Sequence, residues 1–297
     1  MGGSSLTLGV TLAVLGAGLL HASWNALLKA DRSDRLATFG VIMTTGTVMG
    51  LVAVPFLPAI EPGAWKFLAI SVIVHMAYYT FLLKAYSYGD LSHTYPIARG
   101  LGPLLVALVS GQLIGEHLRV QDMLGVLLLS GSLVALALPL RSVLPKAGGR
   151  HGLATLFAVL TGFTIATYII ADGFGVRAAG PDFAHRLSYI AWLCVLEGPW
   201  LLVLAITLRP RTVWSHLRRH WWRGMIGGVI ANTGYGIAIY ALALGPMAHV
   251  AALRETSVLF GALMGTLLLG ESFGRRRVIA ACVIVTGLAL MNGPRLF

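Results

Sequence analysis

Ten long apolar runs constrain this chain more than any other feature of its sequence. A helix that crosses a bilayer needs about 20 mainly apolar residues to span roughly 30 Å of hydrocarbon. The runs cover residues 6–28, 36–57, 64–86, 91–115, 123–140, 152–171, 183–208, 222–242, 247–270 and 278–291. Strand-like alternation is absent from them, and hydrocarbon admits only helices and closed barrels. The sequence therefore predicts an all-α integral membrane protein with ten transmembrane helices, the last of which is short for a span.

Charge is scarce in the chain and unevenly placed. Charged residues make up 11% of the sequence, against roughly a quarter in a soluble domain, which excludes a water-soluble globule. The formal net charge of +11 comes mainly from loops that follow the odd-numbered runs. Those loops hold Lys or Arg at positions 29, 32, 35, 84, 141, 146, 150, 209, 211, 218, 219, 223, 275, 276 and 277, and the opposite loops at 66, 119, 177, 186 and 295. Because cationic loops face the cytoplasm, we expect an inner-membrane protein with both termini outside, whose basic side meets anionic lipid rather than nucleic acid.

The chain divides near its midpoint into two halves of five runs each. We expect a first repeat over 1–141, a polar linker over 142–151 and a second repeat over 152–297. An ungapped shift of 155 residues superposes Arg99 on Arg254 and Gly115-Glu116 on Gly270-Glu271. Because an odd number of spans per repeat reverses the orientation of the second copy, we expect inverted repeats, which are typical of secondary transporters.

The fourth run of each half ends in a Gly-Glu pair, within Leu113-Ile114-Gly115-Glu116 and within Leu268-Leu269-Gly270-Glu271. Together with ten runs in two halves, these motifs resemble the drug/metabolite transporter superfamily, in particular its proteins with two EamA-type domains. The segments 21–25 (HASWN) and 95–100 (YPIARG) are similar to a subset associated with phosphonate utilisation. The resemblance implies a ten-helix transporter of a small metabolite. Many relatives are drawn with both termini in the cytoplasm, which is the opposite of what the loop charges favour here.

Two arginines lie deep in predicted spans, Arg99 in the fourth run and Arg254 in the ninth. An arginine near the bilayer centre costs from about 2.5 to about 17 kcal/mol, depending on the reference state. We expect both to face a central cavity and to bind a carboxylate or phosphonate through paired hydrogen bonds, with Tyr95 on the same helix face as Arg99. The alternatives are an internal ion pair, with Glu255 or Glu197 as the partner, or snorkelling of the arginine to the headgroups.

Polar and aromatic side chains recur at helical spacing in several other runs. We expect them to line a pocket that stacks on, or hydrogen-bonds to, an amphiphilic solute. The alternative is an interfacial aromatic belt with hydrogen bonds between helices. The candidates are His21, Trp24, Asn25, His75, Tyr78, Tyr79, Tyr168, Asn232 and Tyr235.

Acidic residues inside spans are the remaining ionisable candidates. We place only Glu197 and Glu255 well inside predicted helices. Either is a candidate proton carrier, or an ion-pair partner for one of the two arginines. Glu116 and Glu271 end their runs, and we expect them to cap helices or to anchor loops.

Taken together, these features favour a secondary transporter that moves a small organic metabolite, an amino acid or a related carboxylate or phosphonate anion, by alternating access. The alternative is an intramembrane enzyme that acts on a lipid or isoprenoid substrate. The sequence contains no Gly-x-Ser-x-Gly, His-Glu-x-x-His or phosphate-binding Gly-Lys motif, so we do not expect an enzyme. Its two cysteines and its histidines lack disulfide or metal spacing, and we expect no metal and no cofactor. The expected partners are a small-molecule substrate and the lipid bilayer, with the chain a monomer or a homodimer.

Overall fold

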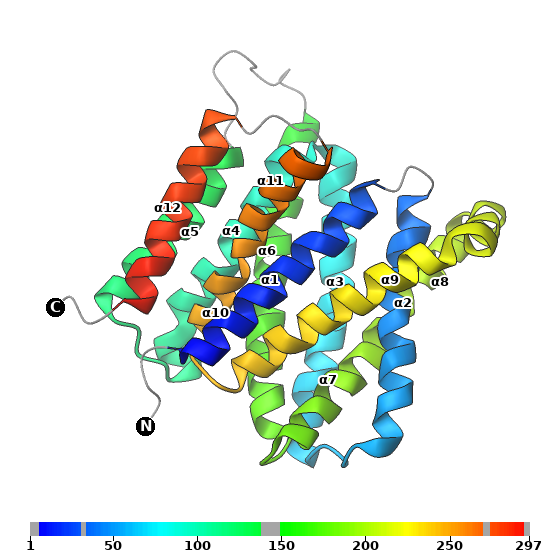
Figure 1. Ribbon diagram of the computed structural model, residues 1–297, viewed down its shortest axis with the longest axis horizontal. Helices are drawn as coiled ribbons and strands as arrows, with labels where there is room; N and C mark the ends of the chain where they lie inside the picture. The colour runs from blue at the N-terminus through cyan, green and yellow to red at the C-terminus, as the bar shows by residue number, and fades with distance from the viewer. Residues whose placement is uncertain (1–5, 31–33, 138–148, 270–273, 294–297) are drawn as a thin grey trace.

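The computed structural model describes residues 6–30, 34–137, 149–269 and 274–293, and these ranges contain helices but no strands (Figure 1). The α-helices are α1 (Leu8–Ala30), α2 (Arg35–Ala53), α3 (Trp65–Tyr88), α4 (Leu91–Val109), α5 (Val120–Ala137), α6 (Gly149–Ala178), α7 (Phe183–Glu197), α8 (Trp200–Leu208), α9 (Pro210–Leu242), α10 (Met247–Arg254), α11 (Thr256–Leu269) and α12 (Arg275–Asn292). Short 3-10 turns cover Val54–Phe56 and Pro62–Ala64, and a π turn covers Ser110–Ile114.

Nine helical segments of the described residues are long and apolar enough to cross a membrane. Two of them each join a pair of helices, α7 with α8 over Phe183–Leu208 and α10 with α11 over Met247–Leu267. The tenth unit, α12, begins with Arg275, Arg276 and Arg277, which make it less apolar than the other nine. The predicted all-α architecture of ten helical units is confirmed.

Several helix boundaries differ from the prediction. α6 continues past Ala171 to Ala178, so that Asp172 lies inside the helix rather than just beyond it. α9 begins at Pro210 instead of residue 222 and includes a polar segment that we had expected to be a loop. The predicted span 183–208 is interrupted after Glu197, because Pro199 has no N–H with which to continue the helical hydrogen bonds.

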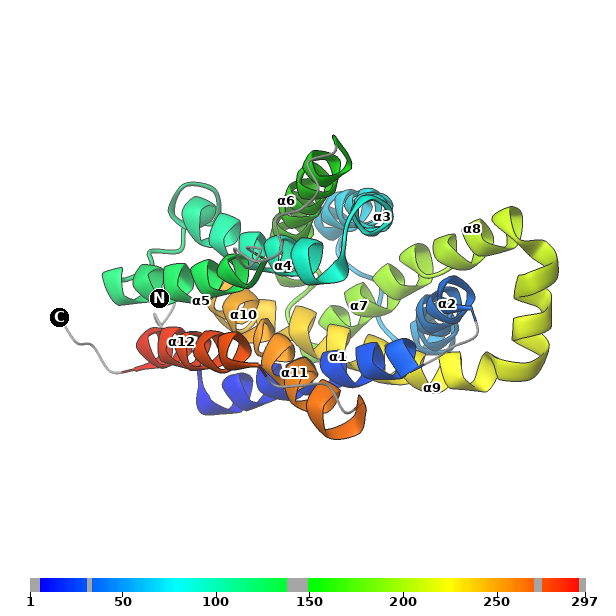
Figure 2. The same cartoon turned by 90° about the horizontal axis from the view of Figure 1, so that it is seen from above.

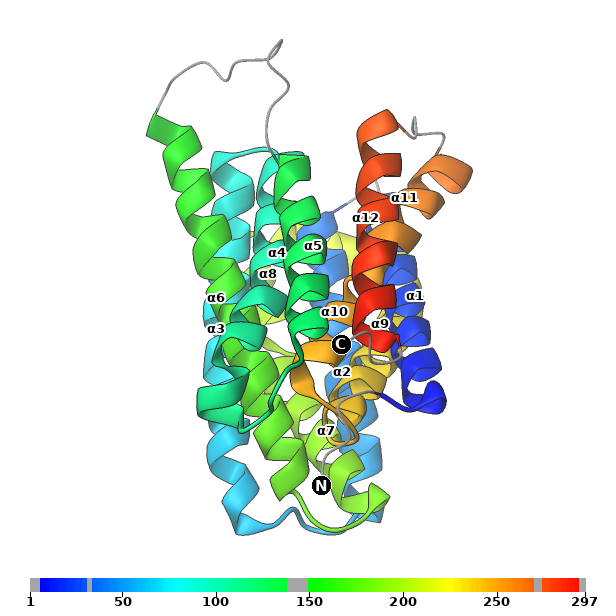
Figure 3. The ribbon, with the colours of Figure 1, turned by 90° about the vertical axis from the view of Figure 1, so that its left-hand side faces the viewer.

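The helices form two layers, which Figure 2 shows from above. One layer holds α3, α4, α5 and α6, the other holds α1, α9, α11 and α12, and α7 and α10 lie between them. Within the layers, α3 and α4 pack on α6, whereas α9 and α11 pack on α1. Each layer therefore combines helices from one half of the chain with the first helix of the other half. α5 packs on α12 at one side, and α1 begins near the end of the bundle at which α12 ends (Figures 1 and 3).

α5 and α12 approach each other closely at a pair of glycines. A Cβ atom on Gly125 would collide with the carbonyl oxygen of Gly287, and a Cβ atom on Gly287 would lie 2.6 Å from the carbonyl oxygen of Gly125. We expect Gly125→Ala to lower the free energy of unfolding by about 1–3 kcal/mol, because the two backbones must separate. Gly131 of α5 has open space where a Cβ would lie, so Gly131→Ala is the matched control and should be neutral or slightly stabilising. Thermal unfolding in detergent measures both, and equal melting temperatures for the two variants would contradict the close contact.

Candidate functional site

Arg99 on α4 is 5% exposed, and its guanidinium forms two hydrogen bonds within the protein. Its Nε donates to Oε2 of Glu255 at 2.9 Å, and its Nη2 donates to Oγ of Ser257 at 3.2 Å. Of the alternatives considered for Arg99, the internal ion pair with Glu255 is the one that the structure contains. The expectation that Arg99 also binds a substrate anion stays a prediction.

Glu255 is also the residue at which the predicted span 247–270 is interrupted. α10 ends at Arg254, Glu255 is its C-cap, and α11 begins at Thr256. A break of this kind exposes helix-terminal backbone groups that lack partners within the helix. The ion pair with Arg99 therefore holds this break against α4, in the layer formed by α3, α4, α5 and α6.

Arg254 is placed differently from Arg99, although the two residues superpose in the sequence repeat. Its guanidinium carbon lies 5.4 Å from the centre of the Tyr235 ring. Among the described residues, no acidic side chain forms an ion pair with it. It borders a cavity of about 10 Å³, roughly the space of one water molecule. The other lining residues are Ala17, Gly18, His21, Gly234 and Tyr235.

A chain of hydrogen bonds beside this cavity joins α3, α9 and α6. Nδ1 of His75 lies 2.8 Å from the carbonyl oxygen of Ser71, and Nε2 of His75 lies 2.9 Å from the hydroxyl of Tyr235. The same hydroxyl lies 2.9 Å from Oδ2 of Asp172, whose Oδ1 accepts from the Tyr189 hydroxyl at 3.2 Å. His75 and Asp172 are 4% and 1% exposed, so the chain is closed to bulk solvent.

The donors and acceptors of this chain limit where its protons can lie. The carbonyl oxygen of Ser71 can only accept, whereas Oγ of Ser71, 3.2 Å from Nδ1 of His75, can donate or accept. We consider the arrangement in which Nδ1 donates to the carbonyl oxygen, the shorter contact. If Asp172 is ionised, the Tyr235 hydroxyl donates to it, and Nε2 of His75 must carry a second proton. If His75 is neutral, Tyr235 donates to Nε2, and the contact with Asp172 requires a protonated carboxyl. With Nδ1 as the donor, the three side chains in both cases hold one proton more than a neutral histidine, a neutral tyrosine and a carboxylate; with Nδ1 accepting from Oγ of Ser71, they hold no extra proton.

Glu197 on α7 approaches His75 at its Nδ1 atom. Its Oε2 is 3.4 Å from Nδ1 of His75 and has no hydrogen-bond partner among the described residues. The carboxylate is 5% exposed. Glu197 is therefore adjacent to the hydrogen-bonded chain without being part of it, and it does not pair with either arginine.

The structure brings most of the predicted aromatic candidates together. The His75 ring stacks on Tyr168, with ring centres 4.3 Å apart and planes 25° apart. Tyr78 and Tyr235 contact both of these rings, and Tyr79 contacts the His75 ring. Tyr95 lies apart from this group, with its ring centre 6.0 Å from the Arg99 guanidinium carbon.

Three other candidates make packing contacts of the kind that we considered as the alternative. Asn232 donates to the carbonyl oxygens of Ile42 and Gly228, and so joins α9 to α2. Trp24 stacks on Phe39 with ring centres 5.7 Å apart. Asn25 donates back to the carbonyl oxygen of His21, one turn earlier in α1.

The first Gly-Glu motif has a local structural role. Gly115 has a φ of 73°, in the left-handed region that glycine adopts without strain, and it ends the π turn after α4. Glu116 then accepts a hydrogen bond from the backbone N–H of Met247 at 2.8 Å and pairs with Arg177 at 2.9 Å. Glu116 thus caps α10 and anchors a loop, as we expected. The second motif, Gly270-Glu271, lies outside the described residues.

Asp172 is the site residue that the sequence analysis missed. The predicted run ended at Ala171, so Asp172 was placed outside it. The prediction that only Glu197 and Glu255 lie well inside helices was therefore wrong, because α6 also contains Asp172. The signal was present, because the residues that follow Asp172 remain apolar or small as far as Val176. The carboxyl is tolerated at this depth because two tyrosine hydroxyls form hydrogen bonds with it.

These features define a multi-pass helical membrane protein with interrupted spans and a buried polar centre. Residues 152–293 match the model of the EamA-like transporter family. It is 28% identical to Uncharacterized protein PA1977 of Pseudomonas aeruginosa, in an alignment that covers 98% of this chain and 94% of that protein. A solved structure described only as "Crystal structure of protein" superposes with a TM-score of 0.73 at 19% identity, and covers 95% of this chain and 96% of that one. The likeness to that structure shows the fold. One EamA domain is matched, and the assignment of residues 1–141 as a second one stays a prediction.

Proposed function

We propose that the protein is a secondary transporter in the inner membrane that moves a small organic anion, an amino acid or a related carboxylate or phosphonate. The observation that carries this proposal is Arg254, a guanidinium without an acidic partner among the described residues, beside a cavity and a break in a spanning helix. An unpaired cation at membrane depth is costly. A carboxylate or phosphonate would satisfy it with paired hydrogen bonds, and interrupted helices are typical of transporter binding sites.

The arrangement of the helices supports alternating access between inverted repeats. The pairing of α3 and α4 with α6 has a counterpart in the pairing of α9 and α11 with α1. The cavity of about 10 Å³ is smaller than any metabolite, so a substrate can enter only if the two layers move apart. His21 is on α1 and Tyr235 on α9, in one layer, and Arg254 ends α10 between the layers. His75 is on α3 and Tyr168 on α6, in the other layer. The substrate would therefore bind between the layers.

We further propose that transport is coupled to a proton held by the chain of His75, Tyr235 and Asp172. With Nδ1 of His75 bonded to the carbonyl oxygen of Ser71, loss of this proton leaves too few hydrogens for both contacts of the Tyr235 hydroxyl, so one of them must break. Because Tyr235 is on α9 and its two partners are on α3 and α6, the loss of either contact would loosen α9 from the other layer. Glu197 and Arg254 are the other charged groups that face this chain. Glu255 is paired with Arg99 and is therefore a poorer proton carrier than Asp172.

Transport can be tested with a panel of amino acids, dicarboxylates and alkylphosphonates. Compounds that raise the melting temperature of the purified protein would then be tested for counterflow in proteoliposomes. We expect Arg254→Gln to lower counterflow about tenfold, the effect of losing roughly 1.4 kcal/mol of binding, with little change in melting temperature. Arg223→Gln is the matched control, because Arg223 also lies over an aromatic ring, that of Trp222 at 5.3 Å, but is exposed.

Two outcomes would contradict the proposal. Normal counterflow by the Arg254→Gln protein would remove Arg254 from the substrate site. Chemical conversion of a compound without its movement across the membrane would instead support an intramembrane enzyme.

A further inference from the structure

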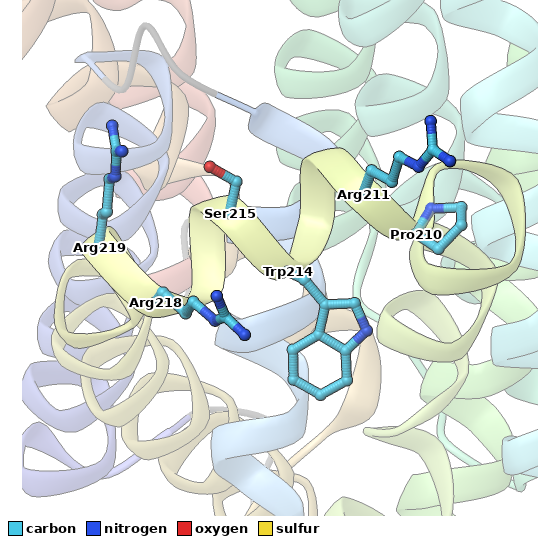
Figure 4. A pocket seen from close by; sticks show the side chains of 6 residues that line it. All are labelled: Pro210, Arg211, Trp214, Ser215, Arg218 and Arg219. Atoms are coloured by element: carbon cyan, nitrogen blue, oxygen red, sulfur yellow. The ribbon is translucent and has the colours of Figure 1, made fainter.

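The first turns of α9 form a basic surface that the transport site does not use. Together with α8, they project from the side of the bundle (Figures 1 and 2). An open hollow of about 570 Å³ lies along them. Figure 4 shows the six side chains that line it, all from one helical segment: Pro210, Arg211, Trp214, Ser215, Arg218 and Arg219.

This segment has two distinct faces. On one face, Val213 and His216 are buried, and His216 contacts the Thr38 hydroxyl of α2 at 3.1 Å. Gly224 continues this face, because a Cβ there would meet the side chain of Val41. The contacts with α2 hold the segment against the bundle, so the opposite face is presented outward in a fixed orientation.

The outward face combines cations with exposed tryptophans. No acidic residue occurs between Arg209 and Arg223. Arg209 lies 3.7 Å from Asp34, whereas Arg211, Arg218 and Arg219 form no ion pair among the described residues. Trp214, Trp221 and Trp222 are 55%, 50% and 47% exposed. A surface that binds only a hydrated anion has no use for three half-exposed indoles, whereas indoles are typical of the membrane interface.

We propose that this hollow binds the phosphate headgroup of an anionic phospholipid. Arg211, Arg218 and Arg219 supply guanidinium groups that donate to phosphate oxygens, which arginine does through paired hydrogen bonds. Trp214 lines the same hollow, with its ring beside Arg218 (Figure 4), where the ring can pack on the glycerol and the first methylenes of the acyl chains. A neutral phospholipid carries no net charge to match the three unpaired cations. The site therefore favours phosphatidylglycerol or cardiolipin over phosphatidylcholine.

Native mass spectrometry of the detergent-purified protein can test the site with added phosphatidylglycerol. We expect one tightly retained phosphatidylglycerol per chain, at least tenfold weaker retention by R211Q/R218Q/R219Q, and weak retention of phosphatidylcholine by both proteins. The matched control is R275Q/R276Q/R277Q, which removes the same number of charges from another helix start and should retain the lipid. A separate titration with inorganic phosphate should leave phosphatidylglycerol bound at millimolar concentrations.

Several results would overturn the proposal. The first is equal retention of phosphatidylglycerol by the triple variant and the wild type, and the second is an equal loss in the control variant. The third is equal retention of phosphatidylcholine. The fourth is displacement of the lipid by millimolar phosphate, which would indicate a site for the free anion. If the triple variant does not fold, Trp214→Ala provides the second test, because it removes the ring and keeps every charge. Its retention of phosphatidylglycerol should fall, and unchanged retention would count against the site.

Discussion

Replacement of Glu255 by Gln is expected to lower the free energy of unfolding by about 3–5 kcal/mol. Glu255 and Arg99 are 3% and 5% exposed and joined by a contact of 2.9 Å. Without the carboxylate, the Arg99 guanidinium stays buried without a counter-charge, and the Oγ of Ser257 is too weak an acceptor to compensate for it. The break between α10 and α11 also loses its contact with α4. Thermal and denaturant unfolding of the purified protein in detergent measure the loss.

Two further variants separate this explanation from a general intolerance of change. The double variant Arg99→Gln/Glu255→Gln removes both charges, and we expect it to recover much of the lost stability, because an uncompensated charge costs more than a missing pair. Arg254→Gln should change stability little, because Arg254 forms no ion pair among the described residues. A double variant no more stable than Glu255→Gln, or an Arg254→Gln protein as unstable as it, would contradict the assigned pairing.

The contrast between these two arginines shows what the sequence can and cannot predict. Arg99 and Arg254 superpose in the internal repeat, and apolar periodicity placed both correctly in spanning helices. Their partners depend on which helices meet across the two layers, and no local pattern in either helix contains that information. Glu255 lies next to Arg254 in the chain, yet it pairs with Arg99 from the other half.

Helix ends were harder to predict than helices, for a physical reason. A charged residue normally ends an apolar run, because hydrocarbon excludes it. Asp172 breaks this rule, since tyrosine hydroxyls from α7 and α9 satisfy its carboxyl inside the bundle. The start of α9 is a second exception, because this polar segment is helical although it lies before the apolar run. Its arginines Arg211, Arg218 and Arg219 lie on an outward face, and Val213 and His216 pack inward. In both places the tertiary partners decide the boundary.

Asp172→Asn is expected to flatten the pH dependence of stability. In the unfolded chain above about pH 6.5, histidine is neutral and aspartate is ionised. In the proposed proton-holding arrangement, the folded chain of His75, Tyr235 and Asp172 holds one proton more, so the native state binds more protons than the unfolded state. The stability of the wild-type protein should therefore fall as the pH rises from about 7 to about 9, by up to about 1.4 kcal/mol per pH unit, until this proton is lost.

The side chain of asparagine can replace the proton itself. The amide NH₂ at position 172 can donate to the Tyr235 hydroxyl, which then donates to Nε2 of a neutral His75, so that every contact is kept without an extra proton. The variant should therefore be more stable than the wild type at pH 9 and less dependent on pH. Tyr189→Phe is the control, because it removes a donor to the same carboxyl and leaves the proton count unchanged. Its pH dependence should match that of the wild type. A wild-type stability that does not change between pH 7 and pH 9, or a slope that persists in Asp172→Asn, would show that the proton is held elsewhere.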